Sequence, residues 1–401
     1  MPINLCAPEK TPIYLNNAAT SWPKPPGVAQ AVAEAIDACP AVGHRQSFAR
    51  KPDTCPLGPT VQECREQLAR LLQVSDPFRI CITANVTHAL NVAIWGLCRA
   101  MPVGAHIVTS VAEHNSVLRP LRHLQRWRPD IRVTYIELDA QGHLSETAFR
   151  DAIQPGIALA VLTHASNVTG RIYEVAPLFR LAKAAGACTL LDSAQSIGHI
   201  PVHPDDLAAD IVAFTGHKGL YGLPGIGGLY VAPGIELEPL LVGGTGADSD
   251  LEEQPEQMPT RLEAGTPNIP AMAGLLAALR WREREGAAFE QRHMALAIRL
   301  RDTLRAMPGI TIFDDAPADE WLGIISFTVA GCGVEDVGRK LFLRQGVICR
   351  TGLHCAPRMH AALGTGAEGT IRLSPSGFTT DEEIDKVISA LARITARVSR
   401  A

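Results

Sequence analysis

The middle of the chain alternates short apolar, β-branched segments with helical patterns, and this alternation limits the possible folds more than any other feature. Several of the strand-like segments are separated by helix-like stretches such as LFRLAKAAG. Strands joined by crossover helices form a mainly parallel sheet. The sequence therefore predicts an α/β domain with seven strands: RICITA, HIVTSV, VTYIEL, IALAVLTHAS, CTLLDSA, DIVAFTG and GGLYVA.

The pattern changes after residue 268. Longer helical segments (AMAGLLAALRWRERE and FEQRHMALAIRLRDTLRAM) mix with a few strands such as GIISFTVA, and the chain closes on the helical pattern TDEEIDKVISALARITARVS. The stretch 243–268 is Gly-rich, then acidic, then Gly/Pro-rich, and is the nearest thing to a linker. We predict a large α/β domain of residues 16–262 and a smaller α+β domain of residues 263–401, with residues 1–15 joined to the smaller one.

Composition excludes several classes of protein. With 401 residues, of which 46% are hydrophobic, the chain is long enough for two domains with a buried core. A net charge of −4 and scattered arginines give no basic field for nucleic acid. The first twenty residues do not resemble a leader, and no apolar run reaches membrane-spanning length. We expect a cytoplasmic protein that binds neither nucleic acid nor membrane.

The ten cysteines form no CxxC pair, and a chain of this size needs no disulfide framework. We therefore expect most of them to be free thiols in packed positions, and we expect no metal site. They stand at positions 6, 39, 55, 64, 81, 98, 188, 332, 349 and 355.

Polar side chains follow five of the predicted strands, where parallel strands end and ligands collect. Taken singly, each is explained as well by a helix cap, a turn or a satisfied histidine. Five ends with complementary chemistry at one edge of a sheet are harder to explain in that way. The residues are Thr87 and His88, Glu113 and His114, Ser166 and Asn167, Asp192 and Gln195, and Thr215, His217 and Lys218.

Pyridoxal phosphate chemistry would use this whole set. A lysine amine forms a Schiff base with the cofactor, an acid stabilises the protonated pyridine nitrogen, and further donors hold the phosphate. In FTGHKGLYGLPGIGG, Lys218 follows a strand and precedes glycines. A P-loop is the alternative for this lysine, but the GxxxxGK[ST] pattern is absent. Lys218 and Asp192 are therefore the candidate amine and acid.

Six segments together resemble the class V aminotransferase-fold enzymes, specifically the cysteine desulfurase and selenocysteine lyase family. They are IYLNNAATSWPKP, AEHNSV, LDSAQSIGHIPV, FTGHKGLYGLPGIGGLYVA, RLEAGTPN and RTGLHCAP, and the resemblance runs from about residue 13 to 395. It implies a PLP-dependent transferase of fold type I, with pyridoxal 5'-phosphate as cofactor, acting as a homodimer.

The resemblance also implies roles for single residues. Lys218 matches the Schiff-base lysine, Asp192 the partner of the pyridine nitrogen, Gln195 the residue bonded to the phenolic oxygen, and His114 the imidazole stacked on the ring. Asn167 matches a residue beside ring and substrate. The positions that match phosphate-binding residues are Thr87, His88, Thr215 and His217, together with Thr266, which matches a threonine reaching the phosphate of the neighbouring subunit.

Two arginines and a thiol complete the predicted site. Arg372 matches the arginine that grips the substrate carboxylate, which suits a planar two-pronged donor. Arg350 is read either as orienting the site or as pairing with a nearby acid. Cys355, in RTGLHCAP, has this arginine five residues upstream, and a positive charge favours thiolate over thiol. Cys349, in the apolar run GVIC, is read as a core residue.

The implied reaction converts L-cysteine or a related amino acid to L-alanine, with the sulfur captured as a persulfide on Cys355 and then passed to a sulfur-acceptor protein. The alternatives are another activity on the same scaffold (selenocysteine lyase, aminotransferase, or another lyase or epimerase) and a cofactor-binding protein without turnover. Two departures from the family pattern, Gly219 inserted after the lysine and Asn115 in place of a second histidine, bear on the subgroup and its sulfur acceptor.

Overall fold

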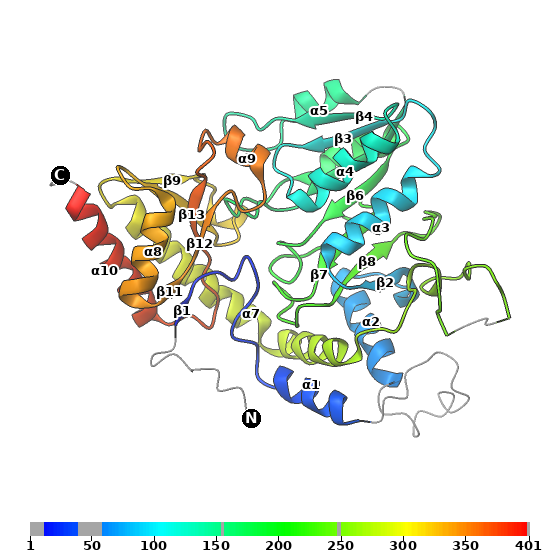
Figure 1. Cartoon of the computed structure of the whole chain (residues 1–401), viewed down its shortest axis with the longest axis horizontal. Coiled ribbons are helices and arrows are strands. Elements are labelled where there is room, and N and C mark those ends of the chain that lie inside the picture. The colour runs from blue at the N-terminus through cyan, green and yellow to red at the C-terminus, as the bar shows by residue number, and fades with distance from the viewer. Residues whose placement is uncertain (1–11, 39–57, 154–155, 247–249, 399–401) are drawn as a thin grey trace. The chain divides into compact units, whose positions relative to one another are not determined.

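The computed structural model describes residues 12–38, 58–153, 156–246 and 250–398 (Figure 1). By contacts it divides into two compact units. One unit contains the described residues up to Trp22, residues 167–171, and the chain from Ala287 onward; the other contains residues 23–166 and 172–286. The predicted bounds of the two domains stay a prediction, and residues 1–11 of the predicted segment 1–15 lie outside the described residues.

The larger unit is built on a seven-stranded sheet with the order β2-β8-β7-β6-β5-β3-β4. Neighbouring strands are parallel except for the two pairs that β8 makes, with β2 and with β7. The predicted α/β class and the mainly parallel sheet are thus confirmed, and all seven predicted strands are present. Their bounds are β2 Ile80–Thr83, β3 His106–Ser110, β4 Arg132–Ile136, β5 Ile157–Thr163, β6 Cys188–Asp192, β7 Ile211–Thr215 and β8 Gly227–Val231.

Helices cover this sheet because its strands carry apolar side chains along their length. β3, β7 and β8 are buried at every residue, as expected for strands covered on both faces. Helix α3 packs against β6, β7 and β8, and α4 packs against α3 (Figure 1). Helix α6 packs against β5 and β6. The helices are α1 Val28–Asp37, α2 Gly58–Leu72, α3 Val86–Cys98, α4 Asn115–Trp127, α5 Glu146–Ala152 and α6 Val175–Ala184, with short 3-10 turns η2 Pro77–Arg79 and η3 Thr260–Leu262.

The smaller unit has a four-stranded antiparallel sheet with the order β12-β13-β10-β9, and a separate parallel pair of β1 and β11. Helix α8 packs on β10, β12 and β13 and also against α10. The strands are β1 Ile13–Tyr14, β9 Ile310–Phe313, β10 Ile325–Val329, β11 Val347–Ile348, β12 Arg350–Gly352 and β13 Thr370–Leu373; the helices are η4 Ala318–Glu320, α8 Val334–Gln345, α9 Pro357–Ala362 and α10 Asp381–Val398.

The predicted closing helix is present as α10, and its start is fixed by a capping box. Thr380 Oγ1 accepts from Glu383 N (3.2 Å), while Glu383 Oε2 accepts from Thr380 N (2.9 Å). This reciprocal pair satisfies two backbone donors at the first turn, which a helix would otherwise leave without partners.

The two helical segments predicted after residue 268 form one helix, α7, which runs for 37 residues over Ile269–Arg305. Gly286, Ala287 and Ala288 stand between the two segments. Alanine favours a helix, and a single glycine inside a helix costs about 1 kcal/mol, which neighbouring contacts readily offset. No helix in the described part of the chain combines the length and the apolarity needed to cross a bilayer.

Candidate active site

The carboxyl ends of β2, β3, β5, β6 and β7 lie along one edge of the large sheet, because these five strands run in the same direction. In open parallel sheets this edge is where ligands bind. The polar residues predicted there follow these ends in the structure: Thr87 and His88 at the start of α3, Glu113 and His114 between β3 and α4, Asp192 and Gln195 at and after the end of β6, and Thr215, His217 and Lys218 at and after the end of β7.

Asp192 is the last residue of β6 and is only 2% exposed. Its Oδ1 accepts a hydrogen bond from Ala194 N (2.9 Å). Burial raises the pKa of the Asp192 carboxyl, opposed by the Ala194 bond, the attraction of Lys218 and a hydrogen bond from Ser116. A buried carboxylate is costly without a cation beside it, so this position suits the partner of a protonated ring nitrogen.

Lys218 stands in a half-buried turn after β7, and its carbonyl oxygen accepts from Tyr221 N (2.8 Å). The next residue, Gly219, packs directly on the backbone that follows β6. A Cβ at Gly219 would lie 2.4 Å from Ile197 O, and a Cβ at Gly198 would lie 2.3 Å from Gly219 O. The inserted glycine is therefore the residue that allows the two loops to touch, and this contact fixes the backbone beside the lysine.

A phosphate would fit between the ends of β2 and β7. Only Gly227 of β8 separates these ends, because it pairs with both Thr83 and Thr215. The Thr215 hydroxyl is buried and has no hydrogen-bond partner among the described residues. The N-terminus of α3 begins at the same place, and helix N-termini favour anions.

His88 and His217, near the ends of β2 and β7, are neutral and so act as hydrogen-bond donors or acceptors rather than as cations. Burial lowers the pKa of His88, whose Nδ1 accepts from Ala84 N (3.3 Å). Burial, followed by repulsion from Lys218 and Lys24, lowers the pKa of His217 to about 4. Thr87, beside His88, is exposed in the first turn of α3.

His114 caps helix α4, since its Nδ1 accepts from Ser116 N (3.0 Å). The residue before it, Glu113, is fully buried, and sequence reasoning gave it no role beyond its place at a strand end. Glu113 Oε1 accepts from Ser110 Oγ (2.6 Å) and from Thr163 N (3.0 Å), which ties the end of β3 to the end of β5. Burial raises the pKa of Glu113 to about 8, opposed by these two bonds and reinforced by repulsion from Asp192.

Arg372, the third residue of β13, is the largest fully buried side chain of the described residues, at 1% exposure. Its Nη1 donates to Asn167 O (2.7 Å) and its Nη2 to Asn16 Oδ1 (3.2 Å), while its Nε is buried without a partner. It makes no ion pair with an acid in the part of the chain that the structure describes. Burial and repulsion from Arg350 lower the pKa of Arg372 to about 9.

Arg350 lies directly across from Arg372, on the neighbouring strand β12. Residues paired in this way lie on the same face of an antiparallel sheet, so the two guanidinium groups gather positive charge there. The Nη2 of Arg350 donates to Cys355 Sγ (3.2 Å). Among the described residues Arg350 has no ion pair with an acid, so its recorded partner is the thiol.

Cys355 lies in a tight turn between β12 and α9. Both His354 (φ 49°) and Cys355 (φ 61°) have left-handed backbones, which only a few per cent of non-glycine residues adopt. His354 is buried, its Nε2 contacts Thr370 Oγ1 (3.0 Å), and its carbonyl oxygen accepts from Asn167 Nδ2 (2.7 Å). Burial, then the charges of Arg372 and its neighbours, lowers the pKa of His354 to about 2, so the ring is neutral.

The structure therefore gathers the predicted residues into two groups, one in each unit. Asn167, predicted with the strand ends, belongs to the unit of Arg372 and Cys355. Thr266 lies in an exposed stretch before α7, where Gly265 N donates to Gly244 O (2.8 Å). Sequence reasoning missed Asn16, whose only signal was its place in the segment IYLNNAAT.

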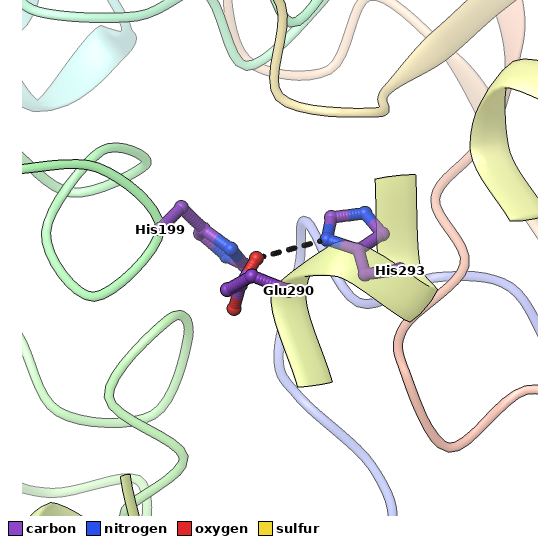
Figure 2. Close-up of side chains that lie close together, drawn as sticks. All are labelled: His199, Glu290 and His293. Carbon is purple, nitrogen blue, oxygen red and sulfur yellow. Dashed lines mark hydrogen bonds and ion pairs between the residues drawn. The ribbon is translucent and has the colours of Figure 1, made fainter. Parts of the chain in front are cut away.

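One further histidine is explained by its own helix. His293 on α7 is buried, and its Nδ1 lies 3.2 Å from Glu290 Oε2, one turn earlier (Figure 2). Residues three apart on a helix face the same side, so this is an ordinary local pair.

Residues 13–387 match the family model of aminotransferase class-V. A protein from Methanothermobacter thermautotrophicus named "Probable cysteine desulfurase" is 36% identical over 83% of this chain and 83% of its own length. Cysteine desulfurase CsdA of Escherichia coli is 31% identical over 95% of this chain and 93% of its own length. The family inferred from the six sequence segments is confirmed by these matches.

Solved structures agree with this result. The apo structure of a cysteine desulfurase from Thermococcus onnurineus superposes with a TM-score of 0.88 at 31% identity, covering 96% of this chain and 95% of that one. The E. coli CsdA structure superposes with a TM-score of 0.85 at 30% identity, with the same coverage. The predicted fold type is confirmed by these neighbours.

Proposed function

Because the chain belongs to the class-V aminotransferase family, we propose that it is a pyridoxal phosphate-dependent cysteine desulfurase. It converts L-cysteine to L-alanine and holds the released sulfur as a persulfide on Cys355. The observation that carries this proposal is the Arg350–Cys355 contact at 3.2 Å. Arg350 pairs across the sheet with Arg372, whose guanidinium makes no ion pair with an acid among the described residues. A thiol beside a cation is a nucleophile, and a buried cation without an acid is a site for a carboxylate.

The residues at the strand ends fit the cofactor. Lys218 would bind it covalently, Asp192 would face its ring nitrogen, Gln195 its phenolic oxygen and His114 the face of its ring. Thr87, His88, Thr215 and His217 would hold its phosphate, a role that the unpartnered Thr215 hydroxyl and the N-terminus of α3 support. When bound, the cofactor supplies an electron sink for the bonds at the substrate's α-carbon.

The protein's own groups then have separate tasks. Arg372 binds the α-carboxylate with two N–H groups, and Asn167 lies beside it, since its carbonyl oxygen already accepts from this guanidinium. The Lys218 amine carries the α-proton. The Cys355 thiolate attacks the substrate sulfur, so that an S–S bond forms as the C–S bond breaks. The electron pair of that bond stays with carbon, which gains a proton and becomes the methyl group of alanine.

An assay of the purified protein tests this function. With L-cysteine and a reducing thiol, it should release sulfide and alanine in equal amounts. Pyruvate in place of alanine, or an amino group transferred to a keto acid, would instead establish a different lyase or an aminotransferase on the same fold. Activity with selenocysteine alone would assign the chain to the selenocysteine lyases.

Changing Arg372 to lysine should raise the KM for L-cysteine about 10- to 100-fold, because a charged hydrogen bond contributes about 1.5–3 kcal/mol and lysine cannot make the two-pronged contact. Steady-state kinetics measures the effect. Arg301→Lys is the matched control: Arg301 is 8% exposed in the same unit and donates to Ala316 O (2.8 Å). An unchanged KM in Arg372→Lys would remove Arg372 from the carboxylate site.

The chain should form a homodimer through the surface that contains Thr266. The exposed segment 265–268 lies beside residue 244, close in sequence to the exposed apolar residues Leu241, Val242 and Leu251. Light scattering should give twice the chain mass, and Val242→Glu should lower it. Val103→Glu, at an exposed valine (89%) elsewhere in the same unit, should leave the dimer intact. A fully active monomer would contradict this arrangement.

The cellular location, the partners and the domain bounds are proposals as well. We place the protein in the cytoplasm, without a nucleic acid or membrane partner, and with a sulfur-acceptor protein that removes the persulfide. We also retain the predicted domains, residues 16–262 for cofactor binding and residues 263–401, together with 1–15, for the thiol and the carboxylate site.

A further inference from the structure

Ser116, in the first turn of α4, makes contact with two residues proposed to touch the cofactor. Its backbone N–H donates to His114 Nδ1 (3.0 Å), and its Oγ lies 2.8 Å from the same nitrogen. The side chain of Ser116 also hydrogen-bonds the Asp192 carboxyl. Ser116 is only 4% exposed, so water does not replace these contacts readily. Sequence reasoning assigned Ser116 no role.

When Asp192 is ionised and His114 is neutral at Nδ1, the three contacts made by Ser116 have only two protons between them, one from its backbone N–H and one from its hydroxyl. Each hydrogen bond needs one proton between its two heavy atoms. The backbone N–H of Ser116 fills one contact with Nδ1. The Oγ–Nδ1 contact and the Oγ–Asp192 contact need two more protons, and the hydroxyl has one. One additional proton on His114 Nδ1 would complete the chain from Nδ1 through Oγ to Asp192, and Nδ1 would then no longer accept from the Ser116 backbone N–H.

We propose that Ser116 is a positioning residue whose hydroxyl couples the protonation of His114 to that of Asp192. The backbone N–H already directed at Nδ1 keeps the neutral ring in its Nε2–H form, with Nε2 as the proton-carrying atom. When Nδ1 carries a proton, it donates to the hydroxyl oxygen and the hydroxyl donates to the Asp192 carboxylate; when Nδ1 is bare, the hydroxyl can donate to either group. The two groups titrate as one unit rather than as two independent sites.

Other charged groups act on Asp192, and they also affect the pH at which the pair of His114 and Asp192 titrates. Lys218, after β7, attracts the Asp192 carboxylate, while Glu113, before α4, repels it. The pKa of Glu113 is raised to about 8 by burial, so this carboxyl titrates within the range of interest. In Glu113→Gln the remaining Oε1 can still accept from Ser110 and Thr163, which removes the titration and keeps the geometry.

The meaning of this coupling for catalysis rests on the proposed function, but its test needs neither substrate nor turnover. The full chain in the Glu113→Gln background, saturated with pyridoxal phosphate, is labelled with ¹⁵N-histidine, and His114 is identified by the signals that His114→Gln removes. Ring-nitrogen shifts are then followed from pH 5 to 9. Asp192→Asn should lower the His114 midpoint by about one pH unit when Ser116 is present.

In Ser116→Ala, the same Asp192→Asn change should move the midpoint by less than about half as much, since only the direct charge effect remains. Ser116→Thr keeps the hydroxyl and should restore the larger shift. Thr134→Val is the control: it removes a hydroxyl–imidazole contact to His106 (2.8 Å) at the other end of β3 and should leave His114 unchanged. Equal shifts with and without the Ser116 hydroxyl, or a His114 that does not titrate in this range, would overturn the proposal.

Discussion

Replacement of Lys218 by alanine is expected to abolish the visible absorbance of the lysine-bound cofactor and to lower turnover at least about 1000-fold. The amine provides both the covalent bond to the cofactor and the transfer of the α-proton, and positioned proton transfer alone contributes about 100- to 10,000-fold. Lys218 is the lysine whose charge acts on the Asp192 carboxyl. The absorbance spectrum and the rate of alanine formation measure the two losses separately.

Lys24 is the rival amine, and it supplies the control. It is half-buried, burial lowers its pKa to about 8, and it acts on His217 as Lys218 does. An amine with a lowered pKa is a stronger nucleophile at neutral pH, so Lys24 has some of the properties of a Schiff-base lysine. Lys24→Ala should nevertheless keep the visible band. A band that survives in Lys218→Ala and is lost in Lys24→Ala would reverse the assignment.

Cys355→Ser is expected to retain the cofactor spectrum and the dimer while losing persulfide formation and nearly all sulfide release from L-cysteine. A serine hydroxyl is a far weaker nucleophile toward sulfur than the cysteine sulfur that contacts the Arg350 guanidinium. Selenium release from selenocysteine should be less affected, because selenium leaves carbon more readily. Mass spectrometry after incubation with L-cysteine detects the added sulfur, and alanine formation gives the rate.

Cys349→Ser provides the matched control for the thiol. Cys349 is half-buried, six residues upstream, and burial raises its pKa to about 11, so it stays a thiol at neutral pH. Its replacement should leave persulfide formation unchanged. Equal rates of alanine formation from L-cysteine by the wild type and Cys355→Ser would rule out the desulfurase mechanism and favour another activity on this scaffold.

Local patterns in the sequence predicted the large sheet and the edge at which its polar strand ends lie. Seven strands form where apolar, β-branched runs occur in the sequence. Hydrophobic periodicity and residue type can be read from a few neighbouring residues, so such strands can be predicted locally. Lys218 and Asp192 could be selected for the same reason: each directly follows or ends such a run. The side chain of Glu113 was visible as a strand-end acid, but its buried bonds to Ser110 and Thr163 were not.

Contacts between distant parts of the chain could not be predicted in this way. Arg372 is held by Asn167 and Asn16, which are 205 and 356 residues away. No local periodicity encodes such pairs, since they depend on how whole elements pack. The left-handed backbone of Cys355 could not be predicted either, because cysteine is not a residue type that favours this conformation. The sequence predicts two helical segments after residue 268, and the structure joins them in the single helix α7.

The turn that carries Cys355 also limits how far a sulfur atom could travel. Only residues 353–356 separate the end of β12 from the start of α9, and both ends of this connection belong to regular elements. A segment of this length spans about 14 Å even when fully extended, and two of its residues are fixed in left-handed backbones. A persulfide on this thiol could not be delivered by a swinging arm. The acceptor would have to dock on this protein and bring its own nucleophile to the place where the persulfide forms. Transfer of the outer sulfur atom would then take place beside the turn of Cys355.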